Sequence, residues 1–254
     1  MDALVREQPD EEALRSIFQE LEFRTLIDRV LKKETSAPLP LFPEKSEGIQ
    51  GDLFANFTGN EPSEAKKSNL ETLESLCCDY QLIDTEEKRK EIIQKLLTSK
   101  ILSLDTETTG TEPMDAELVG MSFSIAENEA FYVPVPSDQD KALKIVNEFR
   151  PVFENENSLK VGQNIKYDMI VLQNYGATVK GPLFDTMIAH YVLQPELRHG
   201  MDYLAEIYLH YQTIHIDELI GPKGKNQKNM RDLDPKDVYL YACEDAEMCI
   251  RDRT

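Results

Sequence analysis

The order of the expected strands between residue 78 and the C-terminus constrains the fold of this 254-residue chain most. Two apolar segments, 118–126 and 130–136, flank the turn residues Glu127 and Asn128, which predicts an antiparallel hairpin. The other expected elements are strands at 79–83, 101–105, 159–163 and near Leu183, and helices at 85–97, 141–153, 165–175, 185–193, 201–209 and from Asp234-Pro235 onward. Antiparallel strands followed by alternating helices and strands are typical of an α/β domain, with a mixed sheet flanked by helices.

Three regions of the chain differ in composition. Residues 1–33 carry apolar side chains at helical spacing, which predicts short helices that must pack on another surface. Residues 34–77 are rich in Pro, Ser, Gly, Asn and charged side chains, so we expect a disordered linker there. Residues 78–254 form the expected globular domain.

The formal net charge of −19 argues against a protein that coats nucleic acid with a broad basic face. It is compatible with an enzyme that binds a few nucleotides at a metal-filled pocket, because bound cations reverse the local field. No run of ~18 apolar residues occurs, and the first residues lack the sections of a signal peptide. We therefore expect a cytoplasmic protein with no membrane contact.

Two carboxylates lie at the end of an apolar segment in the stretch ILSLDTETTG, which begins at Ile101. Side chains two apart on a strand point to the same face, so Asp105 and Glu107 project together. Taken alone, the pair could simply be a strand end that enters solvent. Burying two like charges side by side is costly, so a cation is the alternative explanation.

Two further pairs make that alternative the better one. Asn164 and Asp168 lie four residues apart at the start of a helix, and Tyr241 and Asp245 lie four apart on the last helix. Residues four apart share one face of a helix. Each pair alone could be a helix cap or a solvated surface, but the three patterns together are improbable by chance in a domain of this size.

The order DxE, NxxxD and YxxxD resembles the DEDD-type 3′–5′ exonucleases, in the subgroup with Tyr in the third motif. The stretches DTETTG, ELVGMSFS, VGQNIKYD, FDTMIAHYVL and GKNQ resemble the proofreading exonuclease domain of the bacterial DNA polymerase I family. The likeness covers about residues 78–247. Residues 1–33 resemble the helical end of the 5′-nuclease domain that precedes it in that family. The implied fold is ribonuclease H-like.

The resemblance implies two divalent metal ions, Mg²⁺ with Mn²⁺ or Zn²⁺ as alternatives, which flank a scissile phosphate. Their ligands would be Asp105, Glu107, Asp168 and Asp245, with Asp105 bridging both ions. Tyr241 would orient the attacking water, because an unperturbed Tyr has a pKa of ~10 and is a weak base at neutral pH.

The resemblance also implies a substrate, the single-stranded or frayed 3′ end of DNA. The residues it places at the terminal nucleotides are Thr111, Gln163, Asn164, Tyr167, Arg198, Ile216, Lys223 and Lys225. Thr111 and Ile216 stand where the family often has Leu and an aromatic residue, which leaves base stacking open. The lysines lie in the loop GPKGKNQKNM, which could equally be a solvated loop.

Two segments outside the motifs carry expectations of their own. Gln50, Leu53 and Phe54 in the linker resemble the short peptide by which bacterial replication proteins bind the sliding clamp, although stray hydrophobes in a linker are a serious alternative. The string MCIRDR resembles the translation of an adapter used in sequencing libraries. We therefore expect residues 248–253 not to be native, and the chain to be truncated before a polymerase domain.

Two other functions remain open. One is an RNA 3′ exonuclease of the ribonuclease D type, which shares the metal site. The other is a non-catalytic DNA-binding scaffold, which the presence of all four carboxylates disfavours. The four histidines show no metal-ligand spacing, and we expect a monomer.

Overall fold

A computed structural model describes residues 13–14, 17, 70–222, 224 and 227–253. The chain divides into two compact units, Met1–Pro62 and Ser63–Thr254. In the first unit only Ala13, Leu14 and Ile17 are described, and all three are helical. Apart from these three residues, the expected 5′-nuclease helices lie outside the described residues, and so does most of the expected linker.

A six-stranded mixed sheet forms the centre of the second unit, in the order β1-β4-β3-β2-β5-β6. The strands are β1 (Asp79–Leu82), β2 (Ile101–Thr108), β3 (Leu118–Ala126), β4 (Glu129–Pro134), β5 (Leu159–Gly162) and β6 (Leu183–Asp185). Only β3 runs antiparallel to its neighbours, β2 and β4, whereas the β1–β4, β2–β5 and β5–β6 pairs are parallel. The mixed α/β sheet expected from the strand order is confirmed.

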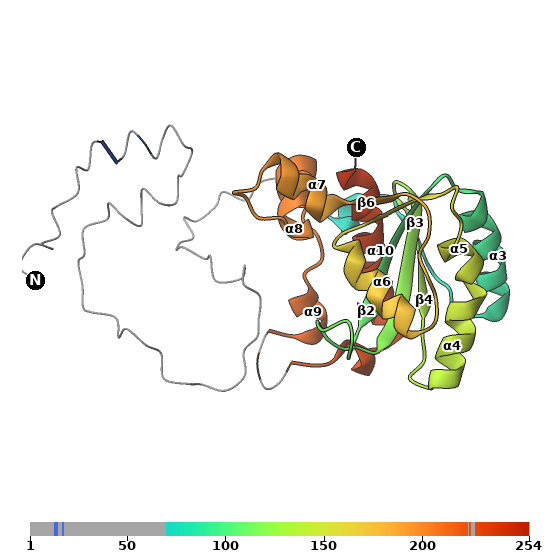
Figure 1. The fold of residues 1–254 in the computed structure, drawn as a ribbon. Helices are drawn as coiled ribbons and strands as arrows, with labels where there is room; N and C mark the ends of the chain where they lie inside the picture. Colours follow the sequence, from blue (N-terminus) through green and yellow to red (C-terminus); the bar gives the residue numbers. More distant parts are fainter. Residues whose placement is uncertain (1–12, 15–16, 18–69, 223, 225–226, 254) are drawn as a thin grey trace, which may run out of the picture. The chain divides into compact units, whose positions relative to one another are not determined.

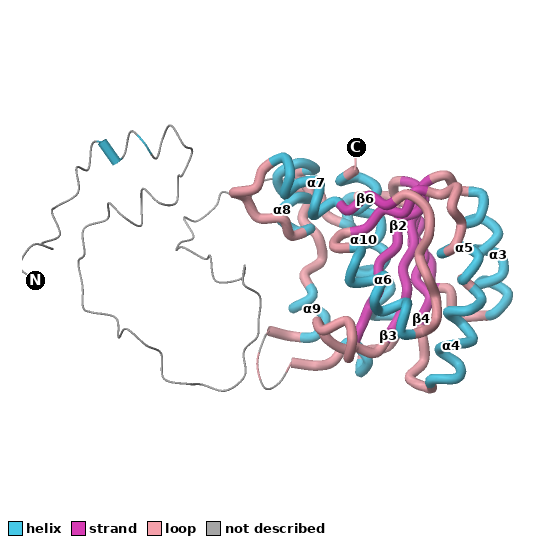
Figure 2. The backbone as a smooth tube through the Cα atoms, in the orientation of Figure 1, coloured by secondary structure: helices cyan, strands magenta, loops and turns pink. Residues whose placement is uncertain are grey.

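Helices cover both faces of this sheet (Figures 1 and 2). On one side lie α3 (Glu86–Thr98), α4 (Gln139–Glu148) and α5 (Arg150–Phe153), and α6 (Ile165–Asn174) contributes to the same apolar core. On the other side α10 (Pro235–Asp252) runs along the strands. The remaining described helices are η1 (Leu73–Ser75), α7 (Thr186–Leu193), α8 (Met201–Leu204), the π-helical turn η2 (Ala205–Leu209), α9 (Ile216–Ile220) and η3 (Met230–Asp232).

Alternation along β2 separates its apolar and acidic side chains. Leu102 and Leu104 are buried in the core beneath α3, α4, α5 and α6. Side chains of a strand alternate between its two faces, so Asp105 and Glu107 project away from the leucines. Together with Ser103 they point toward the α10 side of the sheet. One strand therefore anchors the core and supplies the acidic site.

The folded unit begins earlier than the sequence predicted. Residues 70–77 were assigned to the disordered linker, but Glu71 forms a parallel bridge with Tyr211 and shares backbone hydrogen bonds with His210 and Gln212. Leu76 packs against the buried cluster formed by Ala205, Tyr211 and Met248. A single bridging residue leaves no periodic pattern in the sequence, so this contact could not be predicted.

The last helix begins where the sequence predicted. Asp234 caps α10, accepting a hydrogen bond of 2.9 Å from the Lys236 N–H, and Pro235 occupies the first turn. The helix continues through the MCIRDR string and buries Met248 and Cys249 completely. Among the described helices, none is both long and apolar enough to cross a membrane.

Candidate active site

Two segments far apart in the sequence bring three carboxylates together. Asp105 and Glu107 come from β2, and Asp245 comes from α10, which packs on that strand. One oxygen atom from each of the three lies within 4.8 Å of the other two. Glu107 is only 6% exposed. The arrangement concentrates negative charge in a poorly hydrated place.

The cost of this arrangement appears in the pKa values of the acids. Burial raises the pKa of Asp105 to about 6, against the effect of hydrogen bonds from the Thr106 backbone and the Ser122 side chain. Burial, and then the charge of Asp105, raise the pKa of Glu107 and of Asp245 well above the ordinary range. Without a cation, the cluster therefore holds protons that free carboxylates would release at neutral pH.

Asp168 approaches this cluster from α6 and is held separately. It is 2% exposed, and its Oδ1 accepts a hydrogen bond of 2.6 Å from the Thr106 hydroxyl. Burial, followed by the charge of Asp105, raises its pKa. The charge of the cluster thus affects the pKa of Asp168. Asp168 is nevertheless not one of the three acids whose oxygens lie within 4.8 Å of one another.

Tyr241 lies one helical turn before Asp245 and shares a hydrogen bond with it. Burial, and then the negative charge of Asp245, raise the pKa of the Tyr241 phenol far above its ordinary value. The phenol therefore stays protonated and acts as a hydrogen-bond donor, not as a base.

The donor set fits a hard divalent cation. Carboxylate oxygens are the ligands that Mg²⁺ and Mn²⁺ prefer. The Glu107 Oε1 atom is buried and has no hydrogen-bond partner in the described structure. A buried carboxylate oxygen without a donor is costly, and a cation would remove that cost.

The turn before α6 and the first turn of α6 carry three of the expected substrate residues. The Gln163 side chain bonds to the protein at both ends, because its Nε2 donates to the His199 carbonyl at 2.6 Å and its Oε1 accepts from the Thr186 hydroxyl. Asn164 adopts the left-handed backbone region with φ 58°. The Tyr167 hydroxyl donates to the Gly110 carbonyl at 2.5 Å and lies 2.6 Å from the Thr108 hydroxyl.

The other expected substrate residues are at the surface or outside the described structure. Thr111 and Arg198 are exposed, and Ile216 is 42% exposed at the start of α9. Arg198 lines an open hollow of about 570 Å³. Lys223 and Lys225 are not among the described residues, and neither are Gln50, Leu53 and Phe54.

The sequence matches the family model for the 3′–5′ exonuclease of DNA polymerase A over residues 80–251. The chain belongs to this 3′–5′ exonuclease family. Its match to DNA polymerase I of Pseudomonas aeruginosa is 31% identical over 261 residues, covering 99% of this chain and 25% of the relative. DNA polymerase I of Borreliella burgdorferi is 29% identical over 211 residues, covering 82% and 22%. The exonuclease chain thus spans about a quarter of the length of these curated relatives.

Solved exonucleases share the fold. RNase D from Trypanosoma brucei has a TM-score of 0.56 and 19% identity, covering 68% of this chain and 62% of that chain. RNase D from Escherichia coli has a TM-score of 0.53 and 17% identity, covering 68% and 43%. Brucella melitensis NrnC with bound Mg²⁺ has a TM-score of 0.51 and 18% identity, covering 70% and 79%. The expected ribonuclease H-like fold is confirmed, and so is the membership of the exonuclease family.

Two residues that support the candidate site could not be predicted from the sequence. Thr106 is the unspecified residue between the two acids of the DxE motif, and its hydroxyl donates a hydrogen bond to Asp168. Asp185 caps α7 by accepting the Ile188 N–H at 3.1 Å, and its oxygens also accept the backbone N–H groups of Asn164 and Ile165 at 3.2 and 3.0 Å. Neither role has a local sequence signal, because both partners are distant in the chain.

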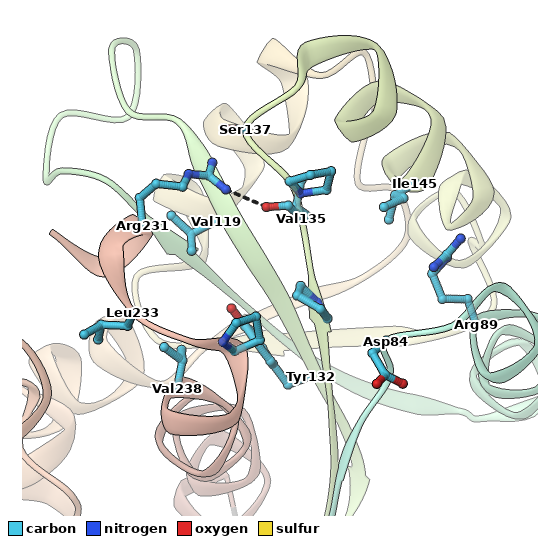
Figure 3. Close-up of a pocket in the computed structure, with 13 residues that line it drawn as sticks. Asp84, Arg89, Val119, Tyr132, Val135, Ser137, Ile145, Arg231, Leu233 and Val238 are labelled. Atoms are coloured by element: carbon cyan, nitrogen blue, oxygen red, sulfur yellow. Dashed lines mark hydrogen bonds between the residues drawn. The ribbon is translucent and has the colours of Figure 1, made fainter.

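A second hollow of the exonuclease, of about 440 Å³, lies between the start of α10 and the end of β4 (Figure 3). Figure 3 shows Arg231 beside Val135, whose carbonyl accepts a hydrogen bond of 2.5 Å from the guanidinium. The same guanidinium donates to the Leu118 carbonyl at 2.6 Å. None of the four site carboxylates lines this hollow. Arg231 thus ties η3 to the ends of two strands, away from the acidic cluster.

Proposed function

We propose that this exonuclease removes nucleotides from the 3′ ends of single-stranded or frayed DNA, using two divalent metal ions, with Mg²⁺ as the first candidate. One observation carries the proposal: three carboxylates from β2 and α10 converge within 4.8 Å while a buried oxygen of Glu107 lacks a partner. The Mg²⁺ bound in the fold relative NrnC supports the choice of ion.

Asp105, Glu107 and Asp245 would hold the metal ions. Asp168, on α6, would supply the fourth carboxylate. Bound divalent cations supply a more acidic water and stabilise charge on the leaving 3′ oxygen. Tyr241, kept protonated and bonded to Asp245, would orient the attacking water through its hydroxyl oxygen. The charge of Asp105 raises the pKa of each of the other three acids, which supports a bridging role for Asp105 between the metal ions.

An exposed lysine, Lys228, near the first motif supports a nucleic-acid substrate in this acidic protein. The Asn229 side chain donates to the Thr109 carbonyl at 2.9 Å, two residues beyond Glu107. This bond holds the end of the GPKGKNQKNM loop beside the first motif, and Lys228 is exposed next to it. We propose that Lys223, Lys225, Arg198, Gln163, Asn164, Tyr167, Thr111 and Ile216 contact the terminal nucleotides.

The decisive experiment incubates the chain with a 3′-labelled single-stranded DNA oligonucleotide, in Mg²⁺ or in EDTA. We expect stepwise release of mononucleotides in Mg²⁺ only. A matched RNA oligonucleotide distinguishes the DNA exonuclease from the RNase D type of activity. Faster degradation of RNA than of DNA would overturn the proposed substrate.

The relatives named DNA polymerase I support a wider role, in which this domain proofreads for a cytoplasmic bacterial DNA polymerase I during replication and repair. We propose a monomer for the isolated chain. Analytical ultracentrifugation should give a single species close to 29.1 kDa.

We also propose that Gln50, Leu53 and Phe54 bind the sliding clamp. Leu53 and Phe54 would enter an apolar pocket of the partner, and Gln50 would bond at its rim. A fluorescent peptide of residues 46–58 should bind the clamp of the source organism saturably. The double substitution Leu53→Ala, Phe54→Ala should eliminate binding and leave nucleotide release from free oligonucleotides unchanged. If the wild-type peptide shows no saturable binding to the clamp, this segment is only a linker.

A further inference from the structure

Two histidines outside the acidic cluster form a direct nitrogen–nitrogen contact. The Nδ1 atoms of His190, on α7, and His199, in the following loop, are 2.7 Å apart. His190 is 6% exposed, and its Nε2 lies 3.1 Å from the Tyr208 hydroxyl. At 2.7 Å the two nitrogens must share a proton, with one imidazole donating and the other accepting.

Aromatic rings surround this histidine pair. The rings of Tyr203 and Tyr208 contact His190 edge-on, and the ring of Tyr191 contacts His199. Arg198 is the charged residue adjacent in the chain. Among the described residues, no carboxylate has a hydrogen bond or ion pair to either imidazole. A second proton on the pair would therefore meet no neutralising charge.

The pair joins α7 to the loop formed by residues 194–200. The Gln194 N–H donates to the His190 carbonyl at 2.8 Å, which fixes the start of the loop. The His199 carbonyl accepts the bond of 2.6 Å from Gln163, which fixes its end against the turn before α6. Arg198 lies between these fixed points, and its side chain is exposed.

We propose that His190 and His199 are positioning residues, which hold the 194–200 loop so that Arg198 is presented to the DNA end. This inference rests on the proposed function, in which Arg198 contacts the substrate. It adds the hydrogen bond between His190 and His199, which fixes the position of Arg198. Without the pair, the loop keeps its contact to Gln163 but loses its attachment to the side of α7.

The shared proton makes the positioning sensitive to acid. A neutral or singly protonated pair retains one Nδ1–H···Nδ1 bond. A doubly protonated pair places two N–H donors against each other and must separate. Burial, and then the neighbouring His199, lower the pKa of His190, so the second protonation needs acid below the usual histidine range.

Binding of a single-stranded oligonucleotide with phosphorothioate 3′ linkages to the full chain in Mg²⁺ tests the proposal. We expect His190→Ala to weaken binding about threefold to tenfold, the value of one hydrogen bond, and to raise KM with kcat unchanged. In the Arg198→Ala background the same substitution should have no further effect. Val192→Ala, on the exposed face of the same helix, is the matched control and should bind as the wild type does.

His190→Asn separates positioning from mere packing. The Asn amide can donate to His199 Nδ1 but does not titrate, so neutral-pH affinity should be restored. The extra loss of wild-type affinity below about pH 6 should then be absent from this variant. Additive effects of His190→Ala and Arg198→Ala, or identical pH profiles of wild type and His190→Asn, would overturn the proposal.

A measurement without DNA keeps the proposal distinct from the proposed function. Imidazole ¹H–¹⁵N NMR of the wild type at neutral pH should show one hydrogen-bonded Nδ1 proton that disappears in His190→Ala. Amide exchange in residues 194–200 should accelerate in the same variant. If the wild type shows this proton and yet binds no oligonucleotide, the proposed function fails while the histidine pair stands. If the wild type lacks this proton, the proposed histidine pair is wrong, and the proposed function is unaffected.

Discussion

The Thr106 hydroxyl donates a hydrogen bond of 2.6 Å to Asp168, and both side chains are buried. Thr106 points to the opposite face of β2 from its neighbours Asp105 and Glu107. Strand β2 therefore orients acids on both of its faces. It supplies two of the site carboxylates directly and fixes a third, from α6, through the intervening residue.

Replacing Thr106 by Val should expose the importance of this bond. The substitution preserves shape but removes the donor from a buried carboxylate, which costs about 1–3 kcal/mol. We expect a lower urea midpoint, together with weaker Mn²⁺ binding measured by calorimetry. Thr106→Ser keeps a hydroxyl and is the control. A Val variant as stable as the Ser variant would mean that Asp168 does not depend on this donor.

Removing an acid of the cluster should separate activity from stability. Asp105→Ala or Asp245→Ala should reduce nucleotide release by several orders of magnitude, because the metal site carries most of the transition-state stabilisation. Tyr241→Phe should be milder, since the carboxylates remain. Release rates from a labelled oligonucleotide measure both effects, and circular dichroism verifies folding. Full activity of Asp105→Ala would overturn the assignment of the site.

The metal-free protein should lose stability as the pH rises from about 4 to 7. The folded-state pKa of Asp105 is raised to about 6, so the folded state binds more protons than the unfolded state across that range. For Asp105 alone the loss is on the order of 2 kcal/mol. Thermal melts in EDTA should show a smaller pH dependence for Asp105→Asn. Added Mn²⁺ should stabilise the wild type most at high pH, where the acids are free to bind it.

Gly120→Ala should disturb the acidic site from the neighbouring strand, β3. Gly120 pairs with Glu107 across the β2–β3 ladder, and a Cβ atom there would overlap the Tyr132 phenol ring. Overpacking of this kind costs about 1–3 kcal/mol. Gly110→Ala is the control for stability, because a Cβ there meets no atom within 4 Å. Equal melting temperatures of the two variants would show that Tyr132 moves aside freely.

The sequence predicted those features that depend on neighbours along the chain. The turn at Asn128, which adopts φ 62°, and the Asp234 cap of α10 were both expected from local patterns. The paired acids of β2 were expected to share a face because strand alternation is a local property. The convergence of Asp245 on them followed only from the family resemblance, since spacing alone does not say which helix packs on which strand.

Other features were missed because a local signal was overlooked or did not exist. The helix expected over residues 141–153 is divided at Phe149, where Pro151 lacks the N–H that a continuous helix requires. That signal was present in the sequence. The histidine pair and the Thr106–Asp168 bond had none, because each depends on tertiary contacts between segments whose own patterns are ordinary.

The origin of the acidic site from β2 and α10 has a consequence for the order of events during synthesis. Asp105 leaves the ribosome long before Asp245, and the sheet can begin to form while the last helix is still being made. Until α10 docks, the early acids face solvent and repel one another without their third partner. The nascent domain would thus lack Asp245, and the three carboxylates of the candidate metal site would converge only after α10 docks.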